Sequence, residues 1–186
     1  MFSSSGCSLC DFETDDHTWY HASDCPIGKS LRDSWTTPDW LTSLLGRFSL
    51  DPCSNERSAV SADRHVCLPE DGLAISWKDH DVFLNGPYSD LLPWAVKCAE
   101  ARSVIALVNH DHSTEWYRAF GRSGLHWEFK FNKRIKFIPP PHIRQSSNSK
   151  PQSLLCTWNA AVRIDKALME LDLGSWWTVR SPSVDT

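Results

Sequence analysis

The sequence predicts an α/β fold in which a mostly parallel sheet is covered by helices on both faces. Segments of strand length alternate with segments of helical period from residue 35 to about residue 122. Ser103–Val108 is a continuous apolar run, which is typical of a strand buried on both faces. Residues 125–131 alternate between apolar and polar side chains, the pattern of a half-buried strand. We therefore expect a three-layer, Rossmann-like sheet with an antiparallel hairpin at its edge.

The individual elements are predicted from their boundary residues. The first helix should have Thr37 as its N-cap and Pro38 at its first position, and it should end at Gly46. A second helix should follow Ser89-Asp90, with Pro93 in its first turn. Further helices are expected at 113–120 and 162–171. Strands are expected at 48–51, 81–84, 103–108, 125–131, 134–138 and 154–158, with a turn at Asn132-Lys133 joining the fourth and fifth.

Length and charge favour a single catalytic domain with unevenly distributed charge. A chain of 186 residues can bury a sizeable core. We expect a polar, acidic arm at 1–33, the domain itself at 34–175 and a tail at 176–186. The net charge is −4, but the stretch 118–150 is strongly basic, with Glu128 as its one acidic residue, so this part of the surface could meet phosphates.

The cysteines and the hydropathy indicate a soluble protein of a reducing cytoplasm. The seven cysteines are odd in number and scattered, which does not indicate a disulfide framework. The sequence contains no run of about 18 apolar residues, the length that a membrane helix requires. We expect no membrane association, and a monomer as the default state.

The turn Asn85-Gly86-Pro87-Tyr88 is the strongest local candidate for a reactive site. It directly follows the apolar strand 81–84, and loops at the carboxyl ends of parallel strands form the usual ligand crevice of such sheets. Asn85 offers a side-chain oxygen and Gly86 a carbonyl, and Tyr88 offers a flat ring. These groups suit a planar heterocycle that carries an amino group. Taken alone, the four residues are better described as a tight turn with a packed tyrosine.

Four segments in a fixed order resemble a known enzyme family. They are Thr37-Pro38-Asp39-Trp40-Leu41, Leu50-Asp51-Pro52-Cys53-Ser54, Asp71-Gly72-Leu73 with Trp77, and Asn85-Gly86-Pro87-Tyr88-Ser89. In this order they resemble the phage-type DNA adenine-N6 methyltransferases of the Dam family. The resemblance extends from about Trp35 to Trp158.

The resemblance implies a cofactor, a substrate and a set of site residues. The cofactor would be S-adenosylmethionine, held near Thr37, Pro38, Asp51, Pro52, Cys53 and Asp71, and the substrate would be double-stranded DNA. The catalytic residues would be Asn85, Gly86, Pro87 and Tyr88, with the target adenine flipped out of the duplex. A phage enzyme of this kind would modify phage DNA in the host cytoplasm and protect it from restriction.

Two departures from the expected pattern leave a second function open. Gly86 stands where the family has a proline, and no glycine-rich loop follows Asp51, where Ser54 and Asn55 are found instead. The alternative is a catalytically weak or inactive protein of the same fold that binds DNA or S-adenosylmethionine and interferes with other enzymes. For Asp51, a strand-ending turn is the favoured interpretation when the other segments are ignored, and for Asp71 a turn before Gly72 is an equal alternative to a cofactor contact.

Two further groups of residues are candidates for binding. Basic residues that we expect to contact phosphates are Lys130, Lys133, Arg134, Lys136 and Arg144, with Lys150 nearby. Cys7, Cys10, His21 and Cys25, together with His17, have spacings that could hold zinc, the alternative being an acidic arm with incidental thiols. His110-Asp111-His112 also raises the question of a metal, but we favour a polar loop near the substrate mouth.

Overall fold

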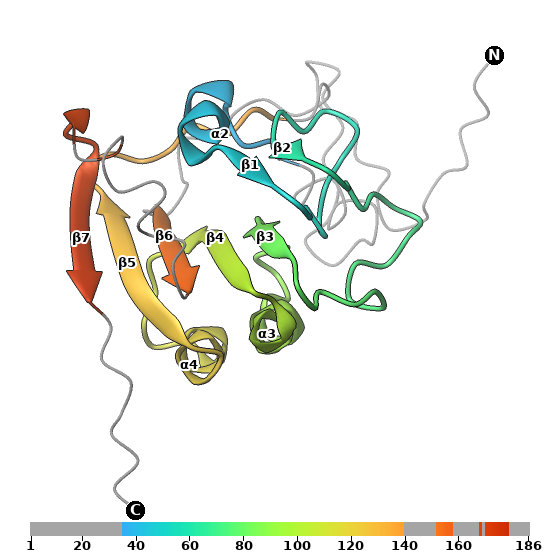
Figure 1. Cartoon of the computed structure of the whole chain (residues 1–186). Helices are drawn as coiled ribbons and strands as arrows, with labels where there is room; N and C mark the ends of the chain where they lie inside the picture. Colours follow the sequence, from blue (N-terminus) through green and yellow to red (C-terminus); the bar gives the residue numbers. More distant parts are fainter. Residues whose placement is uncertain (1–34, 140–151, 158–167, 169, 179–186) are drawn as a thin grey trace, which may run out of the picture.

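A computed structural model describes residues 35–139, 152–157, 168 and 170–178 of the chain (Figure 1). Its core is a five-stranded mixed sheet in the order β3-β4-β6-β5-β7. The strands are β3 (Asp81–Leu84), β4 (Ser103–Asn109), β5 (Leu125–Phe131), β6 (Gln152–Thr157) and β7 (Gly174–Thr178). β3 pairs with β4 in parallel, whereas β6 is antiparallel to both β4 and β5, and β7 is antiparallel to β5. The α/β class is therefore confirmed. The expectation of a mostly parallel sheet is wrong for this sheet, because three of its four pairings are antiparallel.

A second, two-stranded sheet lies next to β3. It consists of β1 (Arg47–Phe48) and β2 (Ser61–Ala62), which pair in parallel. Beyond β1 the chain continues as an extended segment, with Leu50 bridged in parallel to Val82 of β3 and Asp51 bridged in parallel to His65. These bridges place Asp51 beside the carboxyl end of β3.

Helices cover the main sheet on one face, and α2 with the small sheet lies on the other (Figure 1). α3 (Leu92–Lys97), which continues as the short 3-10 helix η1 (Cys98–Glu100), lies beside α4 (Glu115–Arg122). α2 (Asp39–Leu45) lies on the opposite side. Among the described residues, no helix is long and apolar enough to cross a membrane.

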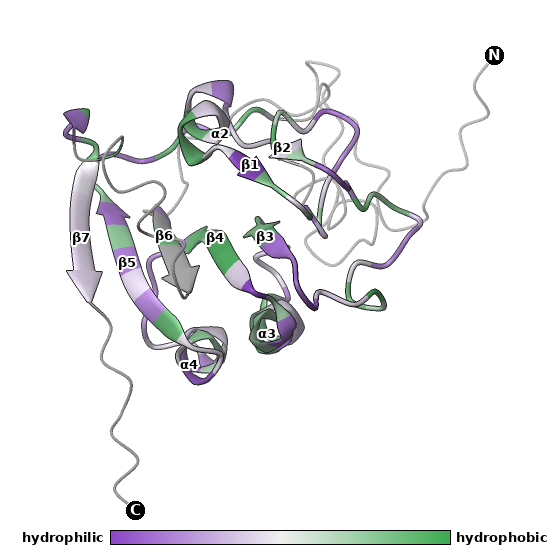
Figure 2. Ribbon diagram, in the orientation of Figure 1, coloured by the Kyte–Doolittle hydropathy of each residue, from purple (hydrophilic) through white to green (hydrophobic). Residues whose placement is uncertain are grey.

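The two faces of the sheet bury separate clusters of side chains. In β4, Val104, Ala106 and Val108 pack with α3 and α4, whereas Ile105 and Leu107 pack with α2. All of them are less than 1 % exposed, which confirms the prediction that this strand is covered on both faces. Figure 2 shows β4 as one of the most apolar strands of the sheet.

The predicted hairpin at 132–138 is wrong. Residues 134–138 form no strand, and only Ile138 makes a ladder contact, with Thr36. Ile135 and Phe137 are buried in the core under α2, so their alternation with charged residues reflects side-chain packing rather than a strand pairing. The antiparallel neighbours of β5 are instead β6 and β7, which come later in the chain.

Smaller differences concern element ends. Pro38, not Thr37, is the N-cap of α2, because the Pro38 carbonyl accepts the first helical hydrogen bond, from the Thr42 N–H. The Thr37 hydroxyl accepts a hydrogen bond from Asn85 instead. Gly46 ends that helix, as expected, and its positive φ of 78° is a backbone conformation that favours glycine. β7 was not anticipated, and it extends the sheet past residue 175. Most of the helix expected at 162–171 lies outside the described residues.

Candidate active site

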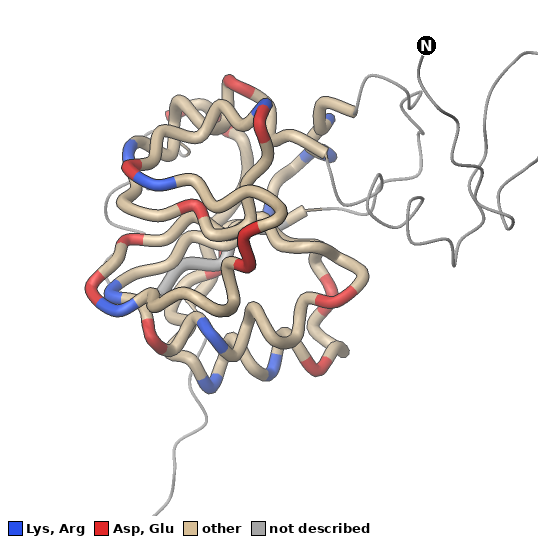
Figure 3. Tube along the Cα trace, turned by 90° about the vertical axis from the view of Figure 1, so that its right-hand side faces the viewer, with Lys and Arg blue, Asp and Glu red and all other residues tan. Residues whose placement is uncertain are grey.

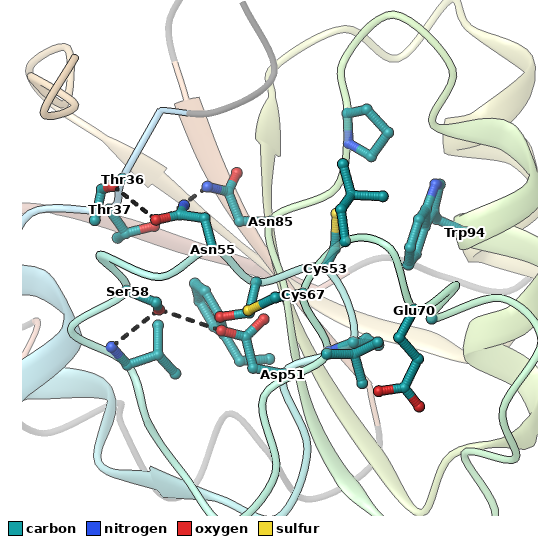
Figure 4. A pocket seen from close by; sticks show the side chains of 18 of the residues that line it. Thr36, Thr37, Asp51, Cys53, Asn55, Ser58, Cys67, Glu70, Asn85 and Trp94 are labelled. Carbon is teal, nitrogen blue, oxygen red and sulfur yellow. Dashed lines mark hydrogen bonds between the residues drawn. The ribbon is translucent and has the colours of Figure 1, made fainter. Parts of the chain in front are cut away.

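A cavity of about 680 Å³ opens at the carboxyl ends of the β1 segment and β3 (Figure 4). This volume is within the usual range for a small-molecule site. The loops after Leu50, Val66 and Leu84 and the residues before α2 supply its walls. Figure 4 shows Thr36, Thr37, Asn55 and Asn85 gathered on one side of the cavity and Trp94 on the other. The predicted residues that line it are Thr37, Asp51, Pro52, Cys53, Asp71, Asn85 and Pro87.

Asp51 places a buried carboxyl group in the cavity wall. Its side chain is 3 % exposed. Its backbone pairs with residues 64–66: the Asp51 N–H donates to the Arg64 carbonyl, and the Val66 N–H donates to the Asp51 carbonyl. The Ser58 hydroxyl donates to Asp51 Oδ2 at 3.3 Å, and His65 Nδ1 lies 3.4 Å from the same oxygen. Burial raises the pKa of Asp51 above its ordinary value, although contacts with Ser54, His65 and Ser58 oppose the change. The carboxylate can accept hydrogen bonds from a hydroxyl or ammonium group.

Asn85 is oriented by the segment that precedes α2. Its Nδ2 donates to Thr37 Oγ1 at 3.3 Å, an assignment that makes Oδ1 the atom that can accept a hydrogen from a bound amine. The neighbouring Thr36 is held to Ile138 by two backbone hydrogen bonds of 2.9 Å. The chain before α2 is therefore a fixed support for Asn85.

Gly86 and Tyr88, the other two residues of the turn, are not among the residues that line the cavity. Gly86 is buried, and a β-carbon there would lie 3.0 Å from Leu91 Cδ1, the end of a flexible side chain. Leu91 thus occupies space next to the position where the resembled family has a proline. The Tyr88 hydroxyl donates to the Leu107 carbonyl at 3.4 Å, and burial of this hydroxyl raises its pKa, while 37 % of the residue remains exposed. The tyrosine is therefore anchored at its polar end, with part of the residue open to solvent.

The loop after Asp51 contains no glycine-rich turn, and its conformation is stabilised by hydrogen bonds to the Asn55 side chain. Asn55 Oδ1 accepts from the Arg57 N–H at 2.9 Å and from the Thr36 hydroxyl at 3.3 Å. Sequence reasoning did not select Asn55, Ser58 or Trp94, all of which line the cavity. The signal for the first two was their position just after a predicted strand end.

The segment Asp71-Gly72-Leu73 is tied to the cavity by close packing. Asp71 Oδ1 accepts a hydrogen bond from the Leu73 N–H at 2.8 Å, which is a turn-forming contact. Asp71 also lines the cavity. A β-carbon on Gly72 would lie 1.8 Å from the Pro52 carbonyl oxygen, so only glycine fits there. Trp77 is fully buried, and its indole N–H donates to the Gly72 carbonyl at 2.9 Å.

Four of the basic residues predicted to contact DNA are described by the structure, and none of these four lines the cavity. Lys133, Arg134 and Lys136 are exposed on a segment that leads to the Ile138–Thr36 bridge, next to the cavity rim. Lys130 lies over the Trp177 ring, with its Nζ 4.9 Å from the ring centroid. Figure 3 shows basic and acidic residues interspersed along the described trace.

Several other candidates lie outside the cavity or outside the described residues. Pro38 is buried at the start of α2 and does not line the cavity. His110 and His112 do not line it either. Arg144, Lys150 and the cysteines and histidines of the N-terminal arm (Cys7, Cys10, His17, His21 and Cys25) lie outside the described residues.

Comparison with known proteins identifies the family. The family model for DNA N-6-adenine-methyltransferase (Dam) matches residues 24–169. The chain is also 28 % identical over 138 residues to the DNA N-6-adenine-methyltransferase of Haemophilus phage HP1, covering 68 % of this chain and 79 % of that protein. No solved structure matches the chain significantly. With the cavity and its ordered motifs in one place, the match over most of its length shows that this chain belongs to the Dam family of DNA N-6-adenine-methyltransferases.

Proposed function

We propose that the protein transfers a methyl group from S-adenosylmethionine to the N6 amino group of adenine in double-stranded DNA. The family supports adenine methylation of DNA as the activity. The observation that carries the finer proposal is that Asp51 and Asn85 line one cavity, although they come from different loops. The Asp51 carboxylate is suited to hold the cofactor, and the Asn85 side-chain oxygen is suited to hold the adenine amine.

The strand arrangement supports a Rossmann-like sheet with its ligand crevice at this cavity. The bridge from Leu50 to Val82 extends the main sheet through the β1 segment to β2. The chain leaves the β1 segment toward β2 on one side, and it leaves β3 toward β4 on the other. Such a reversal is a topological switch point, where ligands bind at the carboxyl ends of strands in open α/β sheets. The cavity occupies this position.

The residues of the cavity fit a nucleoside joined to an amino acid. Asp51 supplies a buried acceptor for a ribose hydroxyl or an ammonium group, and Val60, Phe83 and Trp94 contribute apolar side chains to other parts of the wall. When bound, S-adenosylmethionine supplies a methyl group activated on a sulfonium centre. The residues we assign to holding it are Thr37, Asp51, Pro52, Cys53 and Asp71. Pro38 would support them from the start of α2.

The Asn85 turn would prepare the adenine amine for reaction. The lone pair of this amine is delocalised into the ring, so the site must hold the two hydrogens and favour a tetrahedral nitrogen. Asn85 Oδ1 and the Gly86 carbonyl would accept these hydrogens, Pro87 would hold the turn, and Tyr88 would stack on the base. Flipping the base out of the duplex costs about a few kcal/mol, which stacking and edge contacts offset. Lys130, Lys133, Arg134, Lys136 and Arg144 would contact the DNA backbone.

The direct test is adenine methylation by the purified protein. Unmodified DNA and S-adenosylmethionine are incubated with the wild type, and digested nucleosides are analysed by mass spectrometry for N6-methyladenine. Asn85→Ala should lower the rate by about 100-fold or more, because one preorganised acceptor is lost. Asn132→Ala, at an exposed asparagine that does not line the cavity, is the matched control and should retain the wild-type rate at saturating DNA. Absence of N6-methyladenine at high protein concentration would exclude the proposal.

The position of Gly86 favours one second function, a catalytically weak protein of the same fold that binds DNA or cofactor and interferes with other enzymes. Binding of S-adenosylmethionine in calorimetry, together with the absence of N6-methyladenine in the methylation assay, would identify it.

We further propose that the active enzyme modifies phage DNA in the host cytoplasm and so prevents its restriction. DNA from phage with and without the gene, challenged with restriction enzymes that are blocked by adenine methylation, tests this role.

A further inference from the structure

A buried carboxyl group outside the cavity is held by two histidines. Glu128 lies in β5, and a register shift between Leu125 and Trp127 changes which side chains of this strand face inward. As a result, Trp127 is 36 % exposed, whereas Glu128 is 2 % exposed. The alternation in the sequence predicted the reverse arrangement. Glu128 therefore faces the side of the sheet covered by α4, from which Tyr117 reaches its carboxylate.

The two histidines follow the carboxyl end of β4 and converge on this carboxylate. His112 Nε2 lies 2.9 Å from Glu128 Oε2, and His110 Nε2 lies 3.8 Å from Glu128 Oε1. One potential ligand atom from each of the three residues lies within 4.8 Å of the others. The imidazoles contact each other edge to face, with 4.7 Å between ring centroids. At 3.8 Å the His110 contact is too long for a hydrogen bond, so hydrogen bonding alone does not explain why both rings point to one carboxylate.

Neighbouring residues hold these three side chains in place. The Tyr117 ring stacks on His112, with 4.2 Å between centroids, and its hydroxyl donates to Glu128 Oε2 at 3.4 Å. Between the histidines, Asp111 points elsewhere, since its Oδ1 accepts from the Ser113 N–H and hydroxyl. The loop is thus fixed so that His110 and His112, but not Asp111, face Glu128.

The geometry points to a binding site for a divalent transition-metal ion of the zinc class, formed by His110, His112 and Glu128. Two imidazoles and a carboxylate are typical ligands of such an ion. With metal–ligand distances of about 2.0–2.2 Å, neighbouring tetrahedral ligands lie roughly 3.3 Å apart, and the observed 2.9 and 3.8 Å fall on either side of this value. Tyr117 would orient the carboxylate from the second coordination sphere.

This site is distinct from the methyl-transfer cavity. None of its three residues lines that cavity. The His110 and His112 side chains are 36 % and 43 % exposed, so a fourth coordination position would be open to water or to a ligand. The ion would fasten the loop between β4 and α4 to β5.

The test is binding of Zn²⁺ and Co²⁺ to the full-length protein after chelator treatment. Calorimetry with Zn²⁺ alone gives affinity and stoichiometry, and the absorption spectrum with Co²⁺ gives the ligand type. We expect visible Co²⁺ bands of a nitrogen and oxygen site that persist in a Cys7→Ser/Cys10→Ser variant. Glu128→Gln and His112→Asn should weaken this binding by about 100-fold, and Tyr117→Phe by about 10-fold. His126→Ala, an exposed histidine of the same strand, is the matched control and should change the affinity less than twofold.

Two results would overturn the site. One is the absence of a nitrogen and oxygen type Co²⁺ spectrum at millimolar metal, and the other is unchanged affinity in His110→Asn. His110 is partly exposed, so this variant should fold even if Glu128→Gln does not, and circular dichroism checks folding in each case. Because the readout is metal binding alone, the outcome is independent of whether the protein methylates DNA.

Discussion

Asp51 and Glu128 are both buried carboxyl groups, but their surroundings differ. The side chain of each is 3 % exposed. Asp51 faces a cavity and has a serine hydroxyl and a histidine as neighbours, and burial is the main influence on its pKa. Glu128 is enclosed by two histidines and a tyrosine, and it does not line the cavity. Burial alone therefore does not define a small-molecule site, because open space must also be present beside the carboxylate.

The largest change in stability is expected at Glu128. Glu128→Ala removes the acceptor for His112 and Tyr117 and leaves a gap under α4, so we expect a loss of about 2 kcal/mol in the free energy of unfolding. Urea denaturation measures it. His126→Ala on the same strand should change the value by less than about 0.5 kcal/mol. A Glu128→Ala protein as stable as the wild type would show that these contacts contribute nothing.

Asp51→Asn should have the opposite sign. The substitution keeps the side-chain shape but removes a buried charge, so the unliganded protein should gain about 1 kcal/mol at neutral pH. Asp63→Asn is a matched control, because Asp63 is exposed and pairs with Arg47 on the surface. A clear loss of stability in Asp51→Asn would mean that its contacts with Ser58 and His65 outweigh the cost of burial.

The pH dependence of the unfolding free energy shows whether the cost of burying Asp51 outweighs its contacts with Ser58 and His65. The pKa of Asp51 in the folded state is raised above its ordinary value of 3.8, so the folded state binds the proton more tightly than the unfolded state does. Its contribution to stability is therefore present at low pH and is lost as the pH rises through the folded-state pKa. The difference in unfolding free energy between Asp51→Asn and the wild type should grow from about pH 4 to about pH 7. A constant difference over this range would contradict the raised pKa.

The smallest effect is expected at Gly86. Gly86→Ala retains the backbone carbonyl and brings a methyl group to 3.0 Å from Leu91 Cδ1, which can move aside. We expect a change of less than about 1 kcal/mol in stability and a methylation rate within about threefold of the wild type. A much larger loss of rate with retained folding would show that the position determines the shape of the turn.

Local patterns predicted the elements near the cavity well. The expected strand at 81–84 matches β3, and the expected strand at 103–108 differs from β4 only by Asn109. Both are short and apolar, with clear ends. The order of the motifs also placed Asp51 and Asn85 at neighbouring loops, because parallel strands end at the same edge of a sheet.

The errors arose where distant contacts decide the structure. Residues 134–138 have the alternation of a strand, but Ile135 and Phe137 pack under α2, and β6 takes the place beside β5. The inward position of Glu128 depends on a register shift that its own segment does not reveal. The Thr37 hydroxyl was expected to cap α2, yet it contacts Asn85, which is 48 residues later. In each case the deciding partner lies far away in the sequence.

Binding of S-adenosylmethionine, measured by calorimetry, tests whether the cavity that contains Asp51 is the cofactor site. We predict that the wild type binds one equivalent and that Asp51→Asn weakens binding by about 10- to 100-fold, because a hydrogen bond to a buried charged group is lost. Asp63→Asn should bind as the wild type does. Equal affinities of Asp51→Asn and the wild type would contradict the assignment of the cavity as the cofactor site.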